Sequence, residues 1–267
     1  MSNCKIIAIA NQKGGTAKTT TCCNLGYALA KKGYKVCLVD FDPQANLSLS
    51  CGIPRPERSE SLINDILTRV MDGKPLPDKE KFVIRDKWDK LDIIPSNINL
   101  SVTEINLRDE MAREYILSKL LEPLRSEYSY IIIDTNPYLG LLTLNALTAC
   151  DEIIIPVSPQ LWSATGLTDL LQTILKVKLK INPKIEIAGI LLTICDERTN
   201  LFREAKELVD FYYGSKVNVF NTHIPSTVRV GEANYASRSI LDYDPTSKAA
   251  IAYLNFAEEV IANAQKN

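Results

Sequence analysis

Glycine, lysine and hydroxyl side chains gather in residues 11–21, which read NQKGGTAKTTT and follow an apolar stretch at residues 5–10. A glycine-rich turn between a strand and a helix lets the backbone approach a phosphate, with its N–H groups and the helix N-terminus facing the anion. In such a turn Lys18 can reach the terminal phosphate oxygens, and the hydroxyl of Thr19 can ligate Mg²⁺. The segment therefore predicts a nucleotide-phosphate site, with a turn that only caps the following helix as the simpler alternative.

Two other apolar stretches, residues 35–40 and 130–134, end in acidic side chains. Because side chains on a strand alternate with a period of two, Asp40 and Asp42 point to one side. There they can orient an attacking water and hold the hydration shell of Mg²⁺. Asp134 fits the pattern in which a strand-end aspartate holds a water on Mg²⁺ and orients Thr19. An aspartate at a strand end also commonly caps a turn, so each segment is informative mainly in combination with the others.

The elements that would position these side chains alternate along the chain. Apolar runs predict strands at residues 5–10, 35–40, 130–134, 152–157 and 186–192, with weaker candidates at 91–95 and 217–224. Helical patterns fall at residues 19–32, 101–125, 141–149, 166–180, 200–213 and 246–264. This alternation predicts an α/β fold with a mainly parallel twisted sheet and helices on both faces. Such sheets bind ligands beyond the carboxyl ends of their strands, where all three junctions lie.

Length and composition narrow the class of protein. The 267 residues are 46% hydrophobic with a net charge of −1, so we expect one globular domain over residues 1–267, with a polar surface insertion around residues 55–90 and a helix near 62–71. A single histidine, His223, excludes paired-histidine metal sites, and we expect it to be packed or capped. Seven cysteines without metal-ligand spacing indicate reduced thiols in a cytoplasmic protein. No apolar run approaches the roughly 18 residues that a spanning helix needs.

Together the three junctions resemble those of the ParA/MinD ATPases, which carry a deviant Walker A sequence. The resemblance rests on KGG-x-x-KTT with its early Lys13, on D-x-D-P-Q-x-N at residues 40–46, and on the apolar strand that ends in Asp134. It continues through the Ile-Pro pair at residues 224–225 and covers nearly the whole chain. Its layout is that of the chromosomal Soj-type members, which lack an N-terminal DNA-reading domain. The resemblance implies a P-loop NTPase fold of the deviant Walker A type.

The resemblance also implies roles for individual residues. Lys13 would cross a dimer interface to the partner's phosphates, Lys18 would act within its own subunit, and Asp42 would activate the water. ATP or ADP with Mg²⁺ are the implied cofactors. The implied nucleotide contacts are Gly14, Gly15, Thr16, Ala17, Lys18, Thr19 and Thr20, with Pro225 and Thr227 beside the adenine, and the implied metal site comprises Thr19, Asp40 and Asp134.

Four positions depart from the patterns that the chain otherwise resembles: Gln12, Ala17, Asn136 and Ser226. Gln12 stands where the usual P-loop has its first glycine. Ala17 replaces a glycine. If the backbone has positive φ at this position, alanine is disfavoured there, so the replacement bears on nucleotide affinity or hydrolysis rate. We still expect nucleotide to bind. Asn136 replaces a proline and removes one fixed φ from the segment after Asp134, and Ser226 removes one candidate contact to DNA.

The implied function is a weak ATPase that partitions a chromosome, plasmid or mobile element. The chain would form a homodimer around ATP, bind DNA non-specifically as that dimer, and release it when a ParB-like partner triggers hydrolysis. We therefore expect a cytoplasmic, nucleoid-associated protein without membrane binding. The candidate DNA contacts are Arg198, Arg203, Lys206, Arg229 and Arg238. Each taken alone is more typical of a solvated surface charge, but several on one face of a dimer could bind phosphates non-specifically.

Three alternatives remain open on the sequence. A membrane-positioning ATPase of the MinD type needs a basic amphipathic C-terminal helix, whereas residues 251–267 include Glu258 and Glu259. An electron carrier resembling the nitrogenase iron protein needs cysteines near Asp134, and none lies between Cys51 and Cys150. A nucleotide-dependent scaffold that hydrolyses slowly or not at all is favoured by the replacements at Ala17 and Asn136.

Overall fold

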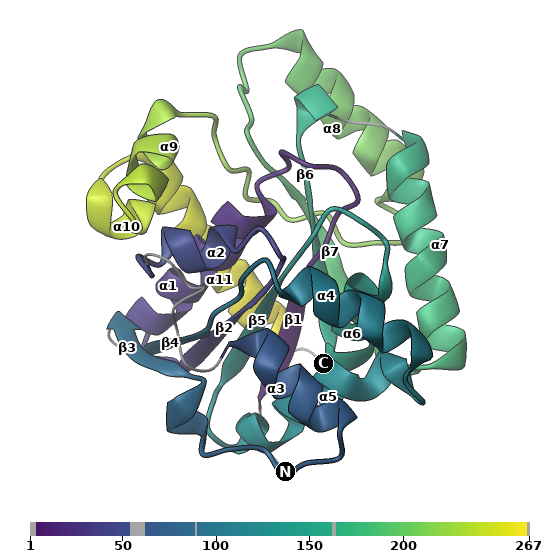
Figure 1. Ribbon diagram of the computed structural model, residues 1–267. Coiled ribbons are helices and arrows are strands. Elements are labelled where there is room, and N and C mark those ends of the chain that lie inside the picture. The colour runs from purple at the N-terminus through teal and green to yellow at the C-terminus, as the bar shows by residue number, and fades with distance from the viewer. Residues whose placement is uncertain (1–3, 54–61, 89, 162–163, 266–267) are drawn as a thin grey trace.

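The computed structural model describes residues 4–53, 62–88, 90–161 and 164–265. Within these ranges seven strands form one sheet in the order β3-β4-β2-β5-β1-β6-β7 (Figure 1). The strands are β1 (Lys5–Ile9), β2 (Val36–Phe41), β3 (Ile84–Trp88), β4 (Leu91–Ile94), β5 (Tyr130–Thr135), β6 (Glu152–Val157) and β7 (Glu186–Leu192). All neighbours pair in parallel except β3, which runs antiparallel to β4 at one edge. The predicted, mainly parallel α/β sheet is confirmed.

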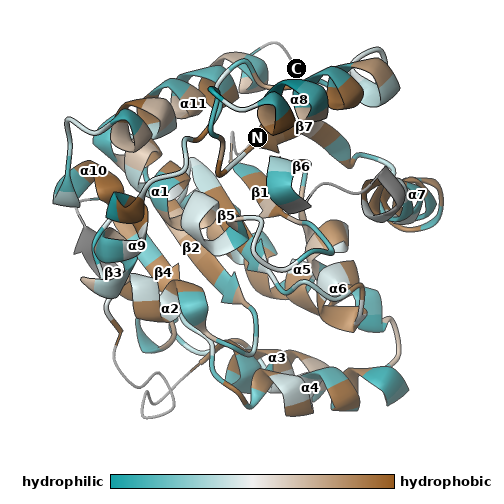
Figure 2. Cartoon of the chain, turned by 90° about the horizontal axis from the view of Figure 1, so that it is seen from above, coloured by the Kyte–Doolittle hydropathy of each residue, from teal (hydrophilic) through white to brown (hydrophobic). Residues whose placement is uncertain are grey.

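Helices cover both faces of the sheet, as Figure 2 shows from above. They are α1 (Lys18–Lys31), α2 (Asn46–Ser50), α3 (Ile63–Met71), α4 (Leu100–Asn106), α5 (Ile116–Leu121), α6 (Leu141–Ala149), α7 (Ala164–Lys180), α8 (Asn200–Tyr213), α9 (Val228–Tyr235), α10 (Ile240–Tyr243) and α11 (Lys248–Ala264). Side chains from α1, α9, α10 and α11 share one hydrophobic cluster, and those from α3 to α8 share the other. Because every residue of β2, β5 and β6 is buried, both faces of the central strands contribute to the core.

The predicted helix over residues 101–125 is wrong as a single element. The chain forms the short helices α4 and α5, which are separated and followed by 3₁₀ turns. Ala112 lies between them with φ of 53°, a left-handed conformation that cannot continue a right-handed helix. Pro123 then lacks the N–H that an α-helix beyond α5 would use.

Two elements at the sheet edges also differ from the sequence-based prediction. Residues 84–88, inside the expected insertion, form strand β3, which is not among the predicted strands. Its expected helix is α3, and residues 54–61 and 89 lie outside the described part. The weak strand candidate at 217–224 is not a strand but makes an isolated bridge from Val219 to Ile190 of β7. Backbone contacts with Ile190 and Leu192 nevertheless hold this segment against the sheet.

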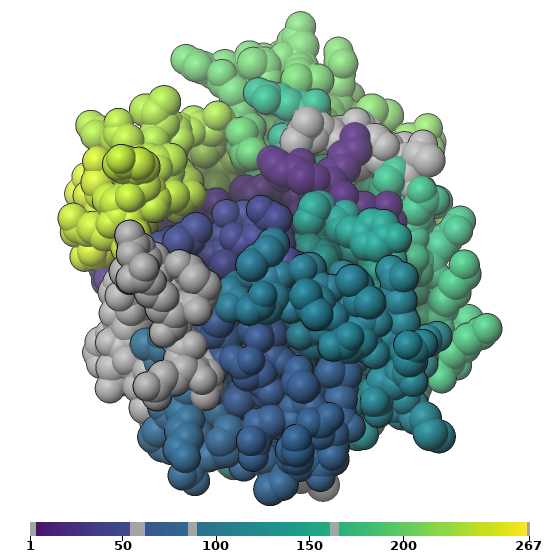
Figure 3. Space-filling model, in the orientation of Figure 1, coloured from purple at the N-terminus to yellow at the C-terminus, as the bar shows by residue number. Residues whose placement is uncertain are grey.

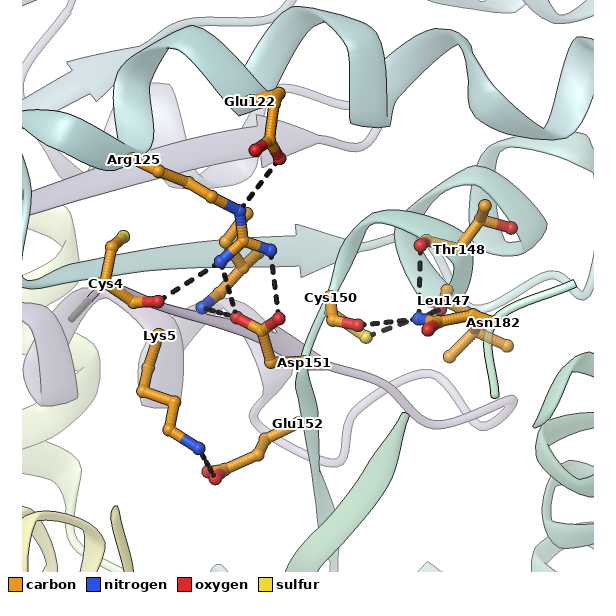
Figure 4. A network of polar contacts seen from close by, with 11 residues as sticks. Cys4, Lys5, Glu122, Arg125, Leu147, Thr148, Cys150, Asp151, Glu152 and Asn182 are labelled. Atoms are coloured by element: carbon orange, nitrogen blue, oxygen red, sulfur yellow. Dashed lines mark hydrogen bonds and ion pairs between the residues drawn. The ribbon is translucent and has the colours of Figure 1, made fainter. Parts of the chain in front are cut away.

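A network of polar contacts fastens the amino ends of the strands (Figure 4). The Arg125 guanidinium donates to both carboxylate oxygens of Asp151, each at 2.9 Å, and to the Cys4 carbonyl at 3.1 Å. Nearby, the Asn182 side chain donates to the carbonyl groups of residues 147, 148 and 150. The network therefore lies at the amino ends of the strands, opposite the carboxyl ends where the three junctions predicted from the sequence lie.

No helix in the described residues is both long and apolar enough to cross a membrane.

Candidate functional site

The three junctions meet at the carboxyl ends of adjacent strands. β5 lies between β2 and β1, and Asp40 pairs in register with Asp134. The loop that follows β1, purple in Figure 1, lies at the same carboxyl ends of the strands. Residues that are far apart in the sequence are thus brought together by parallel pairing, as the sequence predicts.

The loop between β1 and α1 has two residues with positive φ. Gly15 has φ of 75°, and Ala17 has φ of 60° and ψ of 32°. Ala17 is the N-cap of α1, no side chain caps this helix start, and its first turn contains no acidic residue. The backbone N–H groups of that turn therefore suit an anionic ligand. The positive φ of Ala17 is the conformation that the sequence analysis identified as unfavourable for a residue with a Cβ.

Side-chain contacts anchor this loop to the neighbouring strands. The Asn11 amide donates to the Pro156 carbonyl at 2.7 Å, and its oxygen accepts the Lys13 backbone N–H at 3.0 Å. On the other side, the Thr193 hydroxyl donates to the Thr16 carbonyl at 3.1 Å. The loop is consequently tied to the ends of β6 and β7. Asn11 was not selected from the sequence, although an asparagine directly after an apolar stretch that predicts a strand is a usable signal.

Lys18 is held inside the site. Its side chain is buried, and Nζ donates to the Lys13 carbonyl at 2.9 Å. Burial lowers the pKa of Lys18, and the nearby carboxylates of Asp134 and Asp42 oppose that shift. The ammonium group is therefore enclosed between the loop and two acidic side chains.

Asp134 is fully buried at the end of β5. Neither of its carboxylate oxygens has a hydrogen-bond partner within the described residues. Burial raises the pKa of Asp134 well above its ordinary value, and the charge on Asp40 raises it further. Thr19 and Lys18 act in the opposite direction, but the Thr19 hydroxyl does not complete a hydrogen bond of normal geometry. Two bare carboxylate oxygens beside a hydroxyl are suitable ligands for hydrated Mg²⁺.

Asp40 and Asp42 have different surroundings. Asp40 is fully buried and accepts both the backbone N–H and the hydroxyl of Ser48, at 2.8 and 2.6 Å, which fixes α2 to the end of β2. Burial raises the pKa of Asp40 to about 6, although these hydrogen bonds lower it. Asp42 lies further out and accepts the Gln44 backbone N–H at 2.9 Å. Asp42 is therefore the carboxylate of this pair that can face a ligand.

A pocket of about 480 Å³ opens between these elements. Its lining consists of Gly14, Gly15, Ala17, Lys18, Thr19, Thr20, Asp42, Gln44, Asn46, Leu49, Ser50, Pro137 and Asn234. Figure 3 shows the purple surface of the loop between the yellow-green surface of α9 and α10 and the green surface of α8. Seven lining residues were selected from the sequence. Asn234 was not selected, because the residues around it form no motif that marks an asparagine as part of a nucleotide site.

Other selected residues lie outside this lining, as far as the structure describes the chain. Thr16 is buried beneath the loop, and its hydroxyl donates to the Lys13 carbonyl at 3.3 Å. Pro225 pairs with Cys195 after β7, and the Thr227 hydroxyl caps α9 by accepting the Arg229 backbone N–H.

Asn136 lies two residues after Asp134, at the position where the resemblance to the ParA/MinD ATPases implies a proline. It is buried, and its side-chain oxygen accepts the Thr143 hydroxyl at 3.0 Å. The same hydroxyl lies 2.6 Å from the Tyr138 carbonyl. A side-chain hydrogen bond to α6 thus restrains this segment where the fixed φ of a proline is lost.

The five candidate DNA contacts fall on two regions. Arg203 and Lys206 belong to α8, and Arg203 is exposed. Three others form ion pairs with neighbouring carboxylates: Arg198 with Asp196 at 2.9 Å, Arg229 with Glu232 at 3.0 Å and Arg238 with Asp242 at 2.8 Å. These pairs partly neutralise the positive charge that would attract phosphates.

Cysteine and histidine do not form a metal centre in the described residues, where no group of three or more His, Cys, Asp or Glu could hold a metal ion. All seven cysteines are buried free thiols. His223 packs edge-on against Phe202, with ring centroids 5.1 Å apart, and Nδ1 lies 3.4 Å from Glu197.

The fold and the loop between β1 and α1 define a P-loop ATPase of the ParA/MinD class. A family model described as an AAA domain matches residues 4–187. Soj of Bacillus subtilis, named a sporulation initiation inhibitor protein, is 44% identical over 97% of this chain and 99% of its own. The chromosome partitioning protein ParA of Caulobacter vibrioides is 40% identical over 97% and 94%. The chain belongs to this AAA domain family, among its ParA/Soj-type ATPases.

A solved structure of similar shape carries ligands. It is cobyrinic acid a,c-diamide synthase from Mycobacterium smegmatis with bound ADP and magnesium. That protein is 33% identical to this one and superimposes with a TM-score of 0.83, covering 98% of this chain and 95% of its own.

Proposed function

We propose that this protein is a Mg²⁺- and ATP-dependent partitioning ATPase that dimerises around its nucleotide. One observation carries the proposal: beside a glycine-containing loop, the buried Asp134 has two carboxylate oxygens without hydrogen-bond partners in the described residues, next to the enclosed Lys18. A buried carboxylate without a partner is costly, and a hydrated cation offsets that cost. The ADP and magnesium bound to the similar synthase support the same ligands here.

The site residues would act mainly by position and charge. The phosphates would lie on the backbone of residues 14–17 and on the start of α1, and Lys18 would leave the Lys13 carbonyl to neutralise them. Thr19 and Asp134 would hold Mg²⁺, the latter through a water. The ion held by these residues would supply positive charge that neutralises part of the phosphate charge. Asp40 would contribute by fixing α2 through Ser48, rather than by contacting the metal.

Asp42 would orient the attacking water. It lies in the pocket lining, and one of its oxygens is anchored by the Gln44 N–H, which leaves the carboxylate in a defined orientation. Lys13 lies in the same loop but outside the lining, a position compatible with contact to phosphates of a second subunit. Each subunit would then complete the site of the other, so that dimerisation depends on the γ-phosphate.

The name of the Caulobacter vibrioides relative, a chromosome partitioning protein, supports a role in chromosome partitioning. We extend this to non-specific DNA binding by the ATP dimer and to stimulation by a ParB-like partner, which would place the protein on the nucleoid. Arg203 and Lys206 are the foremost candidates for phosphate contact, since the three arginines described above are paired with carboxylates.

A second function is favoured by the backbone of Ala17. Its left-handed conformation in a residue with a Cβ stores strain in the phosphate loop. A loop of this kind suits a scaffold that binds nucleotide and hydrolyses it slowly or not at all. Phosphate release measured at steady state with DNA and partner separates the two functions. DNA and partner should stimulate release by a partitioning ATPase, whereas release by a scaffold should stay close to the protein-free rate.

Sizing the protein with ADP, ATP and a non-hydrolysable ATP analogue tests the main proposal. We expect a monomer with ADP and a dimer with the analogue. Asp42→Ala should accumulate the dimer with ATP, because hydrolysis is blocked, whereas Lys13→Ala should stay monomeric. Lys74→Ala, which changes an exposed lysine in the loop after α3, is the matched control and should behave as the unaltered protein. An unchanged particle mass with every nucleotide would refute the dimer mechanism.

A further inference from the structure

Asn234 on α9 reaches the phosphate loop from a distant part of the chain. Its amide nitrogen donates to the hydroxyl of Thr20 at 3.3 Å, and both residues line the pocket. Thr20 lies in the first turn of α1, two residues beyond Lys18. The contact thus joins a C-terminal helix directly to the wall of the proposed nucleotide site.

A second asparagine strengthens this connection. The Asn24 amide donates to the Thr20 carbonyl at 2.8 Å, while its oxygen accepts the Ser239 hydroxyl and the Ile240 N–H at the start of α10. Thr20 is therefore held at both its hydroxyl and its carbonyl by contacts that lead to α9 and α10. The position of Asn234 relative to the loop is accordingly fixed by the fold and does not depend on one contact.

The direction of the hydrogen bond matters for the ligand. A threonine hydroxyl has one proton to donate and two lone pairs that accept. Because the Asn234 amide can only donate through its nitrogen, it occupies a lone pair of Thr20 and leaves the hydroxyl proton to point elsewhere. The Thr16 carbonyl, one turn earlier, already accepts the Thr193 hydroxyl. A phosphate oxygen in the pocket would offer the Thr20 proton a charged acceptor, which is stronger than a second hydrogen bond to that carbonyl.

We propose that Asn234 is a positioning residue for the nucleotide: it orients the Thr20 hydroxyl so that its proton is donated to a phosphate oxygen. This inference rests on the proposed function, in which the pocket holds a nucleoside di- or triphosphate. It assigns to α9 a direct part in nucleotide affinity, in addition to any contact that the helix makes with DNA.

A double-mutant cycle tests the proposal. Asn234→Leu keeps a branched side chain of comparable shape but cannot donate, and Thr20→Val removes the hydroxyl. We expect Asn234→Leu to weaken binding of Mg-ADP and of a non-hydrolysable Mg-ATP analogue by about fivefold, the value of one ordinary hydrogen bond. In the Thr20→Val background the same change should have no further effect. Isothermal titration gives the affinities, and thermal unfolding without nucleotide checks that each variant is folded.

The control and the contrary outcomes are distinct. Tyr235→Ala alters the neighbouring residue of α9, which is 95% exposed, and should leave affinity unchanged. Equal losses from Asn234→Leu in both backgrounds, or no loss in either, would overturn this inference alone. Failure of the unaltered protein to bind either nucleotide would overturn the proposed function and this inference with it.

Discussion

Replacing Ala17 with glycine measures the backbone strain in the phosphate loop. Ala17 caps α1 with φ of 60° and ψ of 32°. For a residue with a Cβ, this left-handed conformation costs about 1–2 kcal/mol, whereas glycine adopts it without penalty. We therefore expect Ala17→Gly to stabilise the folded protein, in contrast to the usual effect of an alanine-to-glycine change.

The expected gain is smaller than the strain itself. Glycine loses more conformational freedom on folding than alanine does. This entropy loss destabilises the folded state by about 0.5–1 kcal/mol and offsets part of the gain. The net increase in the free energy of unfolding is then about 0.5–1 kcal/mol. For a chain of this size, the midpoint of thermal unfolding should rise by about 1–3 °C.

The assay is thermal unfolding of the nucleotide-free protein beside a matched variant. Ala236→Gly changes an exposed alanine at the C-cap of α9, where φ is −76° and there is no strain to relieve. That variant should be slightly less stable than the unaltered protein. If Ala17→Gly lowers the midpoint as much as Ala236→Gly does, the strain argument is wrong.

Three further predictions concern charge. Burial raises the pKa of Asp134, so the folded protein holds the carboxyl proton of Asp134 more tightly than the unfolded chain does. Stability therefore falls as the pH rises above the pKa that this carboxyl has in the unfolded chain. Without metal and nucleotide, Asp134→Asn should therefore raise the unfolding midpoint more at pH 8 than at pH 5; an equal gain at both contradicts this. Arg125→Ala leaves the partly buried Asp151 without its cation and should lower the free energy of unfolding in urea by about 2 kcal/mol, with unchanged nucleotide affinity. In gel shifts with ATP, replacing both Arg203 and Lys206 by alanine should reduce the slope of log affinity against log salt concentration by about 2. Arg198→Ala should reduce this slope by less, because Arg198 is paired with Asp196. A larger reduction from Arg198→Ala than from the double variant would refute this assignment.

Much of the central sheet could be predicted because its strands are apolar almost throughout. β6 and β7 have the expected bounds, β1, β4 and β5 differ from prediction by one residue at one end, and β2 differs by one residue at both ends. Burial on both faces demands such continuous apolar runs, so they are visible in one sequence. β3 was missed because an edge strand tolerates the polar residues of IRDKW.

Local backbone conformation was harder to predict. The break at Ala112 depends on a positive φ that alanine does not signal, and α9 and α10 are too short for a periodic pattern to stand out. Helices with capping residues were better defined: α8 begins after Thr199, whose side chain accepts the Phe202 N–H, and it has the expected bounds.

In the candidate site, too, the residues of contiguous motifs were predictable from the sequence, whereas contacts between distant segments were not. Residue types at strand ends could be selected because each junction is contiguous in sequence, and the structure brings Lys18, Asp42 and Asp134 together. The contact of Asn234 with Thr20 joins residues 214 positions apart, and no local pattern encodes it. The attachment of Asp40 to Ser48 was missed for a related reason, since it depends on how α2 folds back on β2.

The segment at residues 217–224 has a consequence for how molecules can associate. Its groups occupy the outward-facing carbonyls of β7: the Asn218 side chain donates to Ala188, and backbone N–H groups donate to Ile190 and Leu192. An outer strand with bare carbonyls invites strand addition from another molecule and, in time, fibrous aggregates. With these carbonyls occupied by its own polypeptide, the protein cannot extend its sheet past residues 188–192 of β7 by adding a strand from another molecule.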